Sequence, residues 1–210
     1  MSGMIRKEIC MILQNRKFLV ICFAIYILYT FMFDMDMSFY LPFMAVMLSI
    51  SGFSYDDYNG WQTYASALPK GKTNIVKAKY ITALGLMIAA SILGLVLALA
   101  LIKIKGAGSL EESVSALAGS IVALSLMLAI LFPILFKYGS EKGRMALYIL
   151  AIGIAGITLL LTKVIKVEIS PATMAFLESA AFPILLIVIV AVALGASYFI
   201  SRKIYLSREF

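Results

Sequence analysis

The sequence predicts an all-α integral membrane protein made of one domain, residues 1–210, with six transmembrane helices. Of the 210 residues, 63% are hydrophobic and 14% are charged, and the mean hydropathy is +1.02. A soluble domain typically carries about 25% charged residues. Six apolar runs approach or reach the roughly 20 residues that span a bilayer core. They occupy 18–33 and 39–53 (spans 1–2, within 18–54), 80–102 and 116–136 (spans 3–4, within 80–136), and 145–162 and 181–200 (spans 5–6, within 145–200).

Residues 1–17 precede the first apolar run and are too polar to cross a membrane. Their apolar side chains recur at helical spacing, which favours one apolar face. These side chains are Ile5, Ile9, Ile12 and Leu13. A basic helix with such a face is typical of a segment that lies in the membrane interface. We therefore expect an N-terminal interfacial amphipathic helix, with a solvated leader as the alternative.

Three features are expected at the ends of the later spans. Glu111 and Glu112 should open the helix of the fourth span, and Pro133 should kink it near its end. Ser170 and Pro171 have the pattern of an N-cap followed by proline at the first helical position. They predict a short external helix between spans 5 and 6.

The basic residues set the orientation of the chain, because Lys and Arg gather in cytoplasmic loops. Fourteen of the 18 Lys and Arg residues lie in the N-terminal segment, the loop 55–79, the loop 137–144 and the tail 201–210. The loops 34–38, 103–115 and 163–180 hold the other four. Both termini are therefore expected in the cytoplasm, and the net charge of +7 reflects membrane topology rather than nucleic-acid binding.

The loop 55–79 is the longest polar interruption of the chain, and it contains the only tryptophan. Ser54 and Asp57 have capping-box spacing and predict the start of a helix. One aromatic and apolar face follows at helical spacing. It consists of Trp61, Tyr64, Ala65 and Leu68, and Pro69 ends the helix. This face either rests on lipid headgroups or enters a groove of a soluble partner.

Several chemistries are excluded by what the chain lacks. It has no histidine, so a Ser-His protease is excluded, and its spans carry no ionisable residue of the kind that drives proton- or sodium-coupled carriers. Gly71-Lys72-Thr73 resembles the end of a P-loop, but Ser66 stands where that motif needs glycine. We expect no enzyme activity, cofactor or metal in this chain, and any ATP must be used by another polypeptide.

Nearly the whole chain, most sharply residues 53–80, resembles the permease subunits of ABC-2 type ATP-binding-cassette transporters, in particular the small six-span bacterial group, and is similar to the permeases of phenol-soluble-modulin peptide exporters. The matching residues form one continuous pattern. They are Asp56, Asp57, Gly60-Trp61, Tyr64, Leu68-Pro69, Lys70, Lys72 and Ile75-Val76-Lys77-Ala78-Lys79-Tyr80.

The resemblance implies a half-transporter in a bacterial cell membrane. Two copies, or this chain and a sister permease, would pair with two cytoplasmic ATPase subunits that bind ATP and Mg²⁺. The helix between spans 2 and 3 would be the coupling helix. Its ATPase-coupling residues would be Asp56, Asp57, Trp61, Tyr64, Leu68 and Pro69. The implied cargo is an amphipathic or antimicrobial peptide. A lipid, drug or bacteriocin-immunity exporter and a non-transporting membrane scaffold or sensor are the alternatives.

Overall fold

The computed structural model of the chain describes residues 2–14, 16–33, 39–68, 71–105, 109–160, 179 and 181–208. Within these ranges all regular structure is helical, as the sequence predicts. The helices are α1 (Ser2–Gln14), α2 (Arg16–Phe33), α3 (Tyr40–Tyr58), α4 (Trp61–Ser66), α5 (Gly71–Lys105), α6 (Leu110–Leu159) and α8 (Ala181–Ser207).

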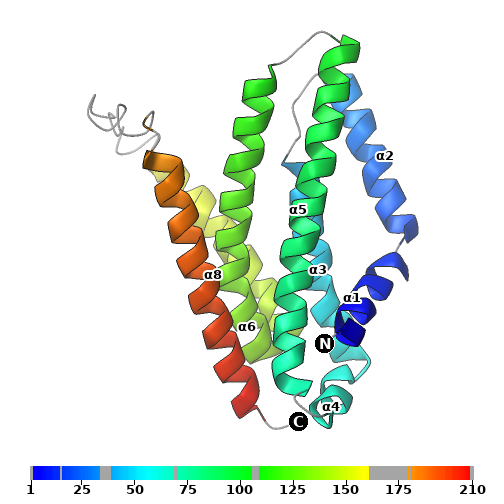
Figure 1. Ribbon diagram of the computed structural model, residues 1–210, viewed down its shortest axis with the longest axis vertical. Coiled ribbons are helices and arrows are strands. Elements are labelled where there is room, and N and C mark those ends of the chain that lie inside the picture. The colour runs from blue at the N-terminus through cyan, green and yellow to red at the C-terminus, as the bar shows by residue number, and fades with distance from the viewer. Residues whose placement is uncertain are drawn as a thin grey trace.

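The long helices form a bundle, and the short helices α1 and α4 lie at one of its ends (Figure 1). Both chain termini lie at this same end, which we call the terminal end. Helix α5 runs away from the terminal end, and the first part of α6 returns to it. The predicted polar loop 55–79 and the two ends of the chain are therefore neighbours in space.

Helix α6 contains a sharp break at Gly139, whose backbone has φ 81° and ψ −178°. This positive φ is a conformation that glycine adopts at little cost. The second part of α6 turns back from the terminal end (Figure 1). The two parts are so close that a Cβ on Gly143 would lie 2.2 Å from Leu135 Cδ2. This reversal comes six residues after Pro133, which lies inside the helix, and the kink expected at Pro133 stays a prediction.

Three of the described helical stretches are long and apolar enough to cross a membrane, namely Gly71–Ile104, Leu110–Gly153 and Phe182–Ser207. A bent pair, Gly3–Gln14 with Leu19–Tyr29, makes a fourth if the two helices count as one span; they meet at 62°. The structure therefore supports a multi-pass membrane protein with three or four candidate spans. The number six stays a prediction.

The predicted start of the central helix differs from the observed one. Ser54 and Asp57 do not cap a new helix, because α3 continues through both residues to Tyr58. The break comes at Gly60, whose φ of 60° and ψ of 21° are left-handed, and α4 begins at Trp61. The expected three-turn helix is therefore the last part of α3 followed by the six residues of α4.

An aromatic cluster holds α3, α5, α6 and α8 together near the terminal end. The Phe53 ring lies edge-on to Phe132 and Phe136, with centroids 5.4 and 4.9 Å away. Tyr80 contacts Phe132 edge-on at 4.8 Å, and Tyr205 contacts Phe136 at 5.4 Å. Such pairs contribute about 0.5–1.5 kcal/mol each beyond their buried area. The cluster fixes the C-terminal part of α3 and the N-terminal part of α5, and α4 lies between these two segments in the chain.

Two further predictions fall on the ends of helices. The N-terminal segment is helical, and Glu111 and Glu112 lie in the first turn of α6, as predicted. The Ser109 hydroxyl accepts a hydrogen bond from the Glu112 backbone N–H at 3.1 Å and so caps this helix. The loop 34–38 and the predicted external helix after Ser170 lie outside the described residues. The placement of α1 in the membrane interface stays a prediction.

Candidate functional site

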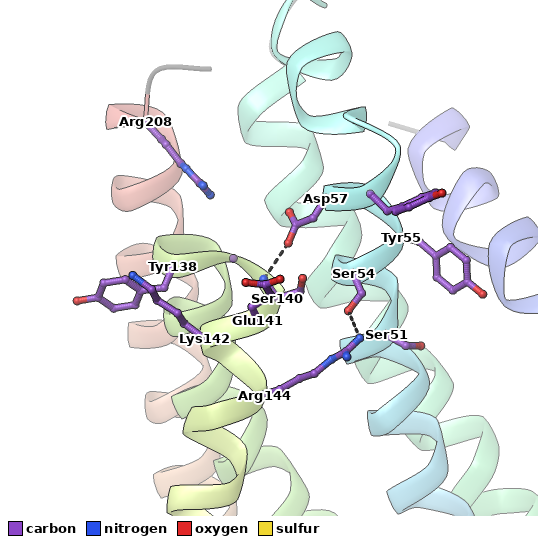
Figure 2. A pocket seen from close by; sticks show the side chains of 12 residues that line it. Ser51, Ser54, Tyr55, Asp57, Tyr138, Ser140, Glu141, Lys142, Arg144 and Arg208 are labelled. Carbon is purple, nitrogen blue, oxygen red and sulfur yellow. Dashed lines mark hydrogen bonds between the residues drawn. The ribbon is translucent and has the colours of Figure 1, made fainter.

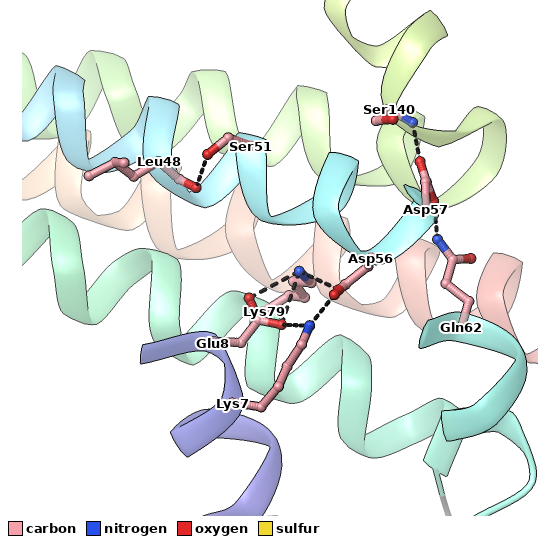
Figure 3. A network of polar contacts seen from close by, with 9 residues as sticks. All are labelled: Lys7, Glu8, Leu48, Ser51, Asp56, Asp57, Gln62, Lys79 and Ser140. Carbon is pink, nitrogen blue, oxygen red and sulfur yellow. Dashed lines mark hydrogen bonds and ion pairs between the residues drawn. The ribbon is translucent and has the colours of Figure 1, made fainter. Parts of the chain in front are cut away.

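The candidate site is the terminal end of the bundle around α4. Its first component is a buried cluster of four charged side chains, Lys7, Glu8, Asp56 and Lys79, which we call the charge quartet (Figure 3). Lys79 Nζ lies 2.7 Å from Asp56 Oδ2 and 3.0 Å from Glu8 Oε1. Lys7 pairs with Asp56 and lies 3.0 Å from Glu8 Oε1. The quartet joins α1, the end of α3 and the start of α5.

The quartet is electrically balanced, with two cations and two carboxylates. The side chains of Lys79, Asp56 and Glu8 are 3%, 4% and 8% exposed, so water screens them little. A buried charge of this kind is stable only when its partners neutralise it, and removal of one partner costs about 3–5 kcal/mol. Two aromatic rings complete the shell, since Lys79 Nζ lies 4.6 Å from the Phe53 ring centroid and Lys7 Nζ 5.1 Å from that of Trp61.

The two predicted acidic residues have different surroundings. Asp56 belongs to the quartet and is 3% exposed. The Asp57 carboxylate accepts a hydrogen bond from the Ser140 backbone N–H at 2.8 Å and another from the Gln62 side chain (Figure 3). Asp57 thereby connects the end of α3 both to α4 and to the turn at Gly139. The role of the two acids in contacting an ATPase stays a prediction.

The aromatic and apolar residues predicted for the site also separate into two groups. Trp61 is half-buried and packs against the core, with its ring 5.3 Å from that of Tyr64. Tyr64 and Leu68 are 62% and 37% exposed, so they are the part of the predicted face that a partner can reach. Pro69 lies outside the described residues. Ala65, on the inner face, is completely buried.

Close packing, rather than phosphate binding, explains why position 71 is glycine. Its backbone N–H donates to the Leu68 carbonyl at 2.8 Å. A Cβ at this position would lie 1.8 Å from the Ala65 carbonyl oxygen, a distance at which the backbone must shift. Glycine is therefore needed where the start of α5 passes the end of α4. Among the described residues, no group of three or more His, Cys, Asp or Glu side chains is placed to hold a metal ion.

The C-terminal end of α8 is also hydrogen-bonded to the terminal end of the bundle. The Lys72 ammonium donates to the Arg208 backbone carbonyl at 2.6 Å, and the Arg208 guanidinium donates to the Phe136 carbonyl at 3.3 Å. The terminal end therefore connects α5, α6 and α8 by polar contacts as well as by the aromatic cluster.

A polar cavity of about 780 Å³ opens between the end of α3 and the turn at Gly139 (Figure 2). We call it the α3–α6 cavity. It is lined by Ser51, Ser54, Tyr55, Asp57, Tyr58, Tyr138, Gly139, Ser140, Glu141, Lys142, Arg144 and Arg208. Arg144 crosses it and donates to the Ser54 hydroxyl at 2.9 Å.

Sequence reasoning missed the partners of the two acids, namely Lys7, Lys79, Gln62 and Ser140, and the third acid of the site, Glu8. Two of them carry a weak signal. Glu8 is the only acid within 1–17, and Lys79 directly precedes an apolar run. Such charges at the edge of a membrane segment are costly unless paired. The backbone N–H of Ser140 carries no sequence signal.

Comparison with curated proteins and with solved structures finds no match. A family model described as ABC-2 family transporter protein matches residues 3–206, almost the whole chain. Members of this family are the membrane components of ATP-binding-cassette transporters. The helical bundle, its candidate spans and this match together place the chain in the ABC-2 transporter family.

Proposed function

We propose that this chain is the permease subunit of an ATP-driven exporter and that a separate cytoplasmic ATPase docks on α4. The observation that carries the proposal is the exposed pair of Tyr64 on α4 and Leu68 just after it, next to Ala65, which α4 buries against the core. Aromatic and aliphatic side chains on a rigid helix are common anchors in helix-in-groove recognition. The partner would supply the sites for ATP and Mg²⁺.

The contacts of α4 with its neighbouring helices support a role in transmitting motion. Gln62 and Trp61 link α4 to Asp57 and Lys7, so a push on α4 reaches α1, α3 and α6 through hydrogen bonds and ring contacts. In this proposal closure of the ATPases moves α4, and the helices attached to it shift between inward- and outward-open states. Both termini then lie in the cytoplasm, as the basic loops favour.

The cargo is proposed to be an amphipathic or antimicrobial peptide. The runs 80–102, 116–136 and 181–200 contain no charged residue, which suits a cargo with an apolar face. The working unit has two permease copies, or this chain with a sister permease, in a six-span topology.

Substitution of either exposed residue of α4 tests the proposal. Tyr64→Asp or Leu68→Asp is expected to weaken binding of the ATPase subunit encoded beside this chain by at least about tenfold, because anchor residues typically contribute 2 kcal/mol or more. The measurement is co-purification of the two subunits from membranes, together with cargo-stimulated ATP hydrolysis.

Leu110→Asp is the matched control, since Leu110 is 51% exposed and begins α6 at the opposite end of the bundle. It is expected to leave the complex intact. Normal coupling in both α4 variants would contradict the assignment of α4. A scaffold protein would show no cargo-stimulated hydrolysis with any ATPase.

A further inference from the structure

The α3–α6 cavity lies beside α4 but does not include it. Its walls come from the last turns of α3, from residues 138–144 around the Gly139 turn, and from Arg208. In Figure 2 Arg144 extends from α6 to Ser54 of α3, and Asp57 of α3 points to Ser140. The cavity volume of about 780 Å³ is within the range of pockets that hold a ligand or several side chains.

Within the part of the chain that the structure describes, two cations of the lining have no acidic partner. None of the ion pairs within the described residues includes Lys142 or Arg144. Arg144 donates to the neutral Ser54 hydroxyl, and Lys142 Nζ lies 5.7 Å from the Tyr138 ring centroid. The charged residues of the lining are the cations Lys142, Arg144 and Arg208 and the acids Asp57 and Glu141, so its formal charge is +1. The cavity therefore favours an anionic occupant.

Aromatic surface surrounds these cations. Tyr58 is 90% exposed and Tyr138 is 49% exposed, and both line the cavity. Tyrosine and arginine are enriched in protein–protein interfaces, where the ring packs against apolar stems and the guanidinium binds a carboxylate through two parallel hydrogen bonds. The combination fits an acidic peptide segment.

The cavity and α4 form one continuous surface. Asp57 bonds both Gln62 of α4 and the backbone of Ser140 in the cavity wall. Tyr58 lines the cavity at the end of α3, and α4 begins three residues later at Trp61. A protein docked on Tyr64 and Leu68 is thus brought against the mouth of the cavity.

We propose that the α3–α6 cavity is a second docking site, which receives an acidic segment of the same ATPase subunit that binds α4. The inference rests on the proposed function, and it adds the chemistry of the partner. Carboxylates of the segment bind Arg144 and Lys142, and the rings of Tyr58 and Tyr138 cover its apolar parts. Two contacts, one on each side of Asp57, would fix the direction in which the ATPase pushes.

The test is the double variant Lys142→Glu/Arg144→Glu in the full-length permease, reconstituted in nanodiscs of neutral lipid. Its affinity for the neighbouring ATPase subunit is expected to fall by at least about tenfold, because like charges then face the acidic segment. The wild-type affinity should also decrease more steeply with ionic strength than that of the variant, since salt screens the lost attraction.

The control variant is Arg202→Glu/Lys203→Glu, which makes the same change in net charge at two exposed positions of α8 outside the lining. It should bind as the wild type does. An equal loss in this control would overturn the cavity as the site, because the effect would then be one of overall charge. Both variants change exposed side chains, so an unchanged unfolding midpoint is expected and confirms that each is folded.

The remaining outcomes separate the two proposals. If the wild type does not bind the ATPase at all, the proposed function fails. If the wild type binds, Tyr64→Asp abolishes binding and the cavity variant binds normally, the second docking site is overturned and the coupling role of α4 stands. A loss seen only in nanodiscs that contain anionic lipid would assign the cavity to a lipid headgroup and would also overturn the inference.

Discussion

Replacing Lys79 with methionine is expected to destabilise the protein by about 3–5 kcal/mol, because it leaves two carboxylates and one cation in a buried site. Lys79 is 4% exposed and pairs with both Glu8 and Asp56. Methionine keeps most of the side-chain volume, so the lost charge dominates the effect. The measurement is thermal or denaturant unfolding of the purified permease in detergent.

The control is Lys77→Met, two residues earlier on the same helix, where the lysine is exposed. It should change the free energy of unfolding by about 0.5 kcal/mol or less. The double variant Lys79→Met/Glu8→Gln removes one charge of each sign and should recover part of the lost stability. A Lys79→Met variant as stable as Lys77→Met would show that the quartet is not a buried, charge-balanced unit.

Gly71→Ala is expected to have the second large effect. The added methyl group would lie 1.8 Å from the Ala65 carbonyl oxygen, which belongs to the backbone and has no flexible end that could give way. We expect α4 to shift, the free energy of unfolding to fall by about 2–3 kcal/mol, and ATPase binding to weaken by at least about tenfold. Unfolding and co-purification measure the two consequences separately.

Gly85→Ala is the control on the same helix, because a Cβ there meets nothing within 4 Å. Alanine favours a helix interior over glycine by up to about 1 kcal/mol, so this variant should be neutral or slightly stabilising. The two glycine-to-alanine changes thus have opposite expected signs. Equal effects at both positions would mean that the close approach of Gly71 to α4 does not hold in the folded protein.

Much of the fold follows from composition and periodicity, since apolar runs of this length favour membrane helices. The position at which α3 ends does not follow from composition and periodicity, for a physical reason. The apolar run stops at Phe53, yet the helix continues to Tyr58, because Asp56 finds partners in Lys7 and Lys79. Those partners lie far away in the sequence, and a local pattern carries no information about them.

The start of α4 was open to prediction from the residues themselves. Asn59-Gly60 is a common turn signal, and Gly60 adopts the left-handed conformation that such a turn requires. The expected start at Ser54 is wrong because the turn at Asn59-Gly60 separates α3 from α4. The division of the predicted face, with Ala65 buried and Tyr64 and Leu68 exposed, does not follow from helical spacing, because it depends on how α4 packs against the core.

The charge quartet also constrains the order in which the chain can fold. Lys7 is separated from Asp56 by 49 residues, and Glu8 from Lys79 by 71. During synthesis from the N-terminus, Lys7 and Glu8 have only each other as partners until α3 and the first turns of α5 have been made. Firm attachment of α1 to the bundle is therefore a late event, although α1 precedes the other described helices in the chain.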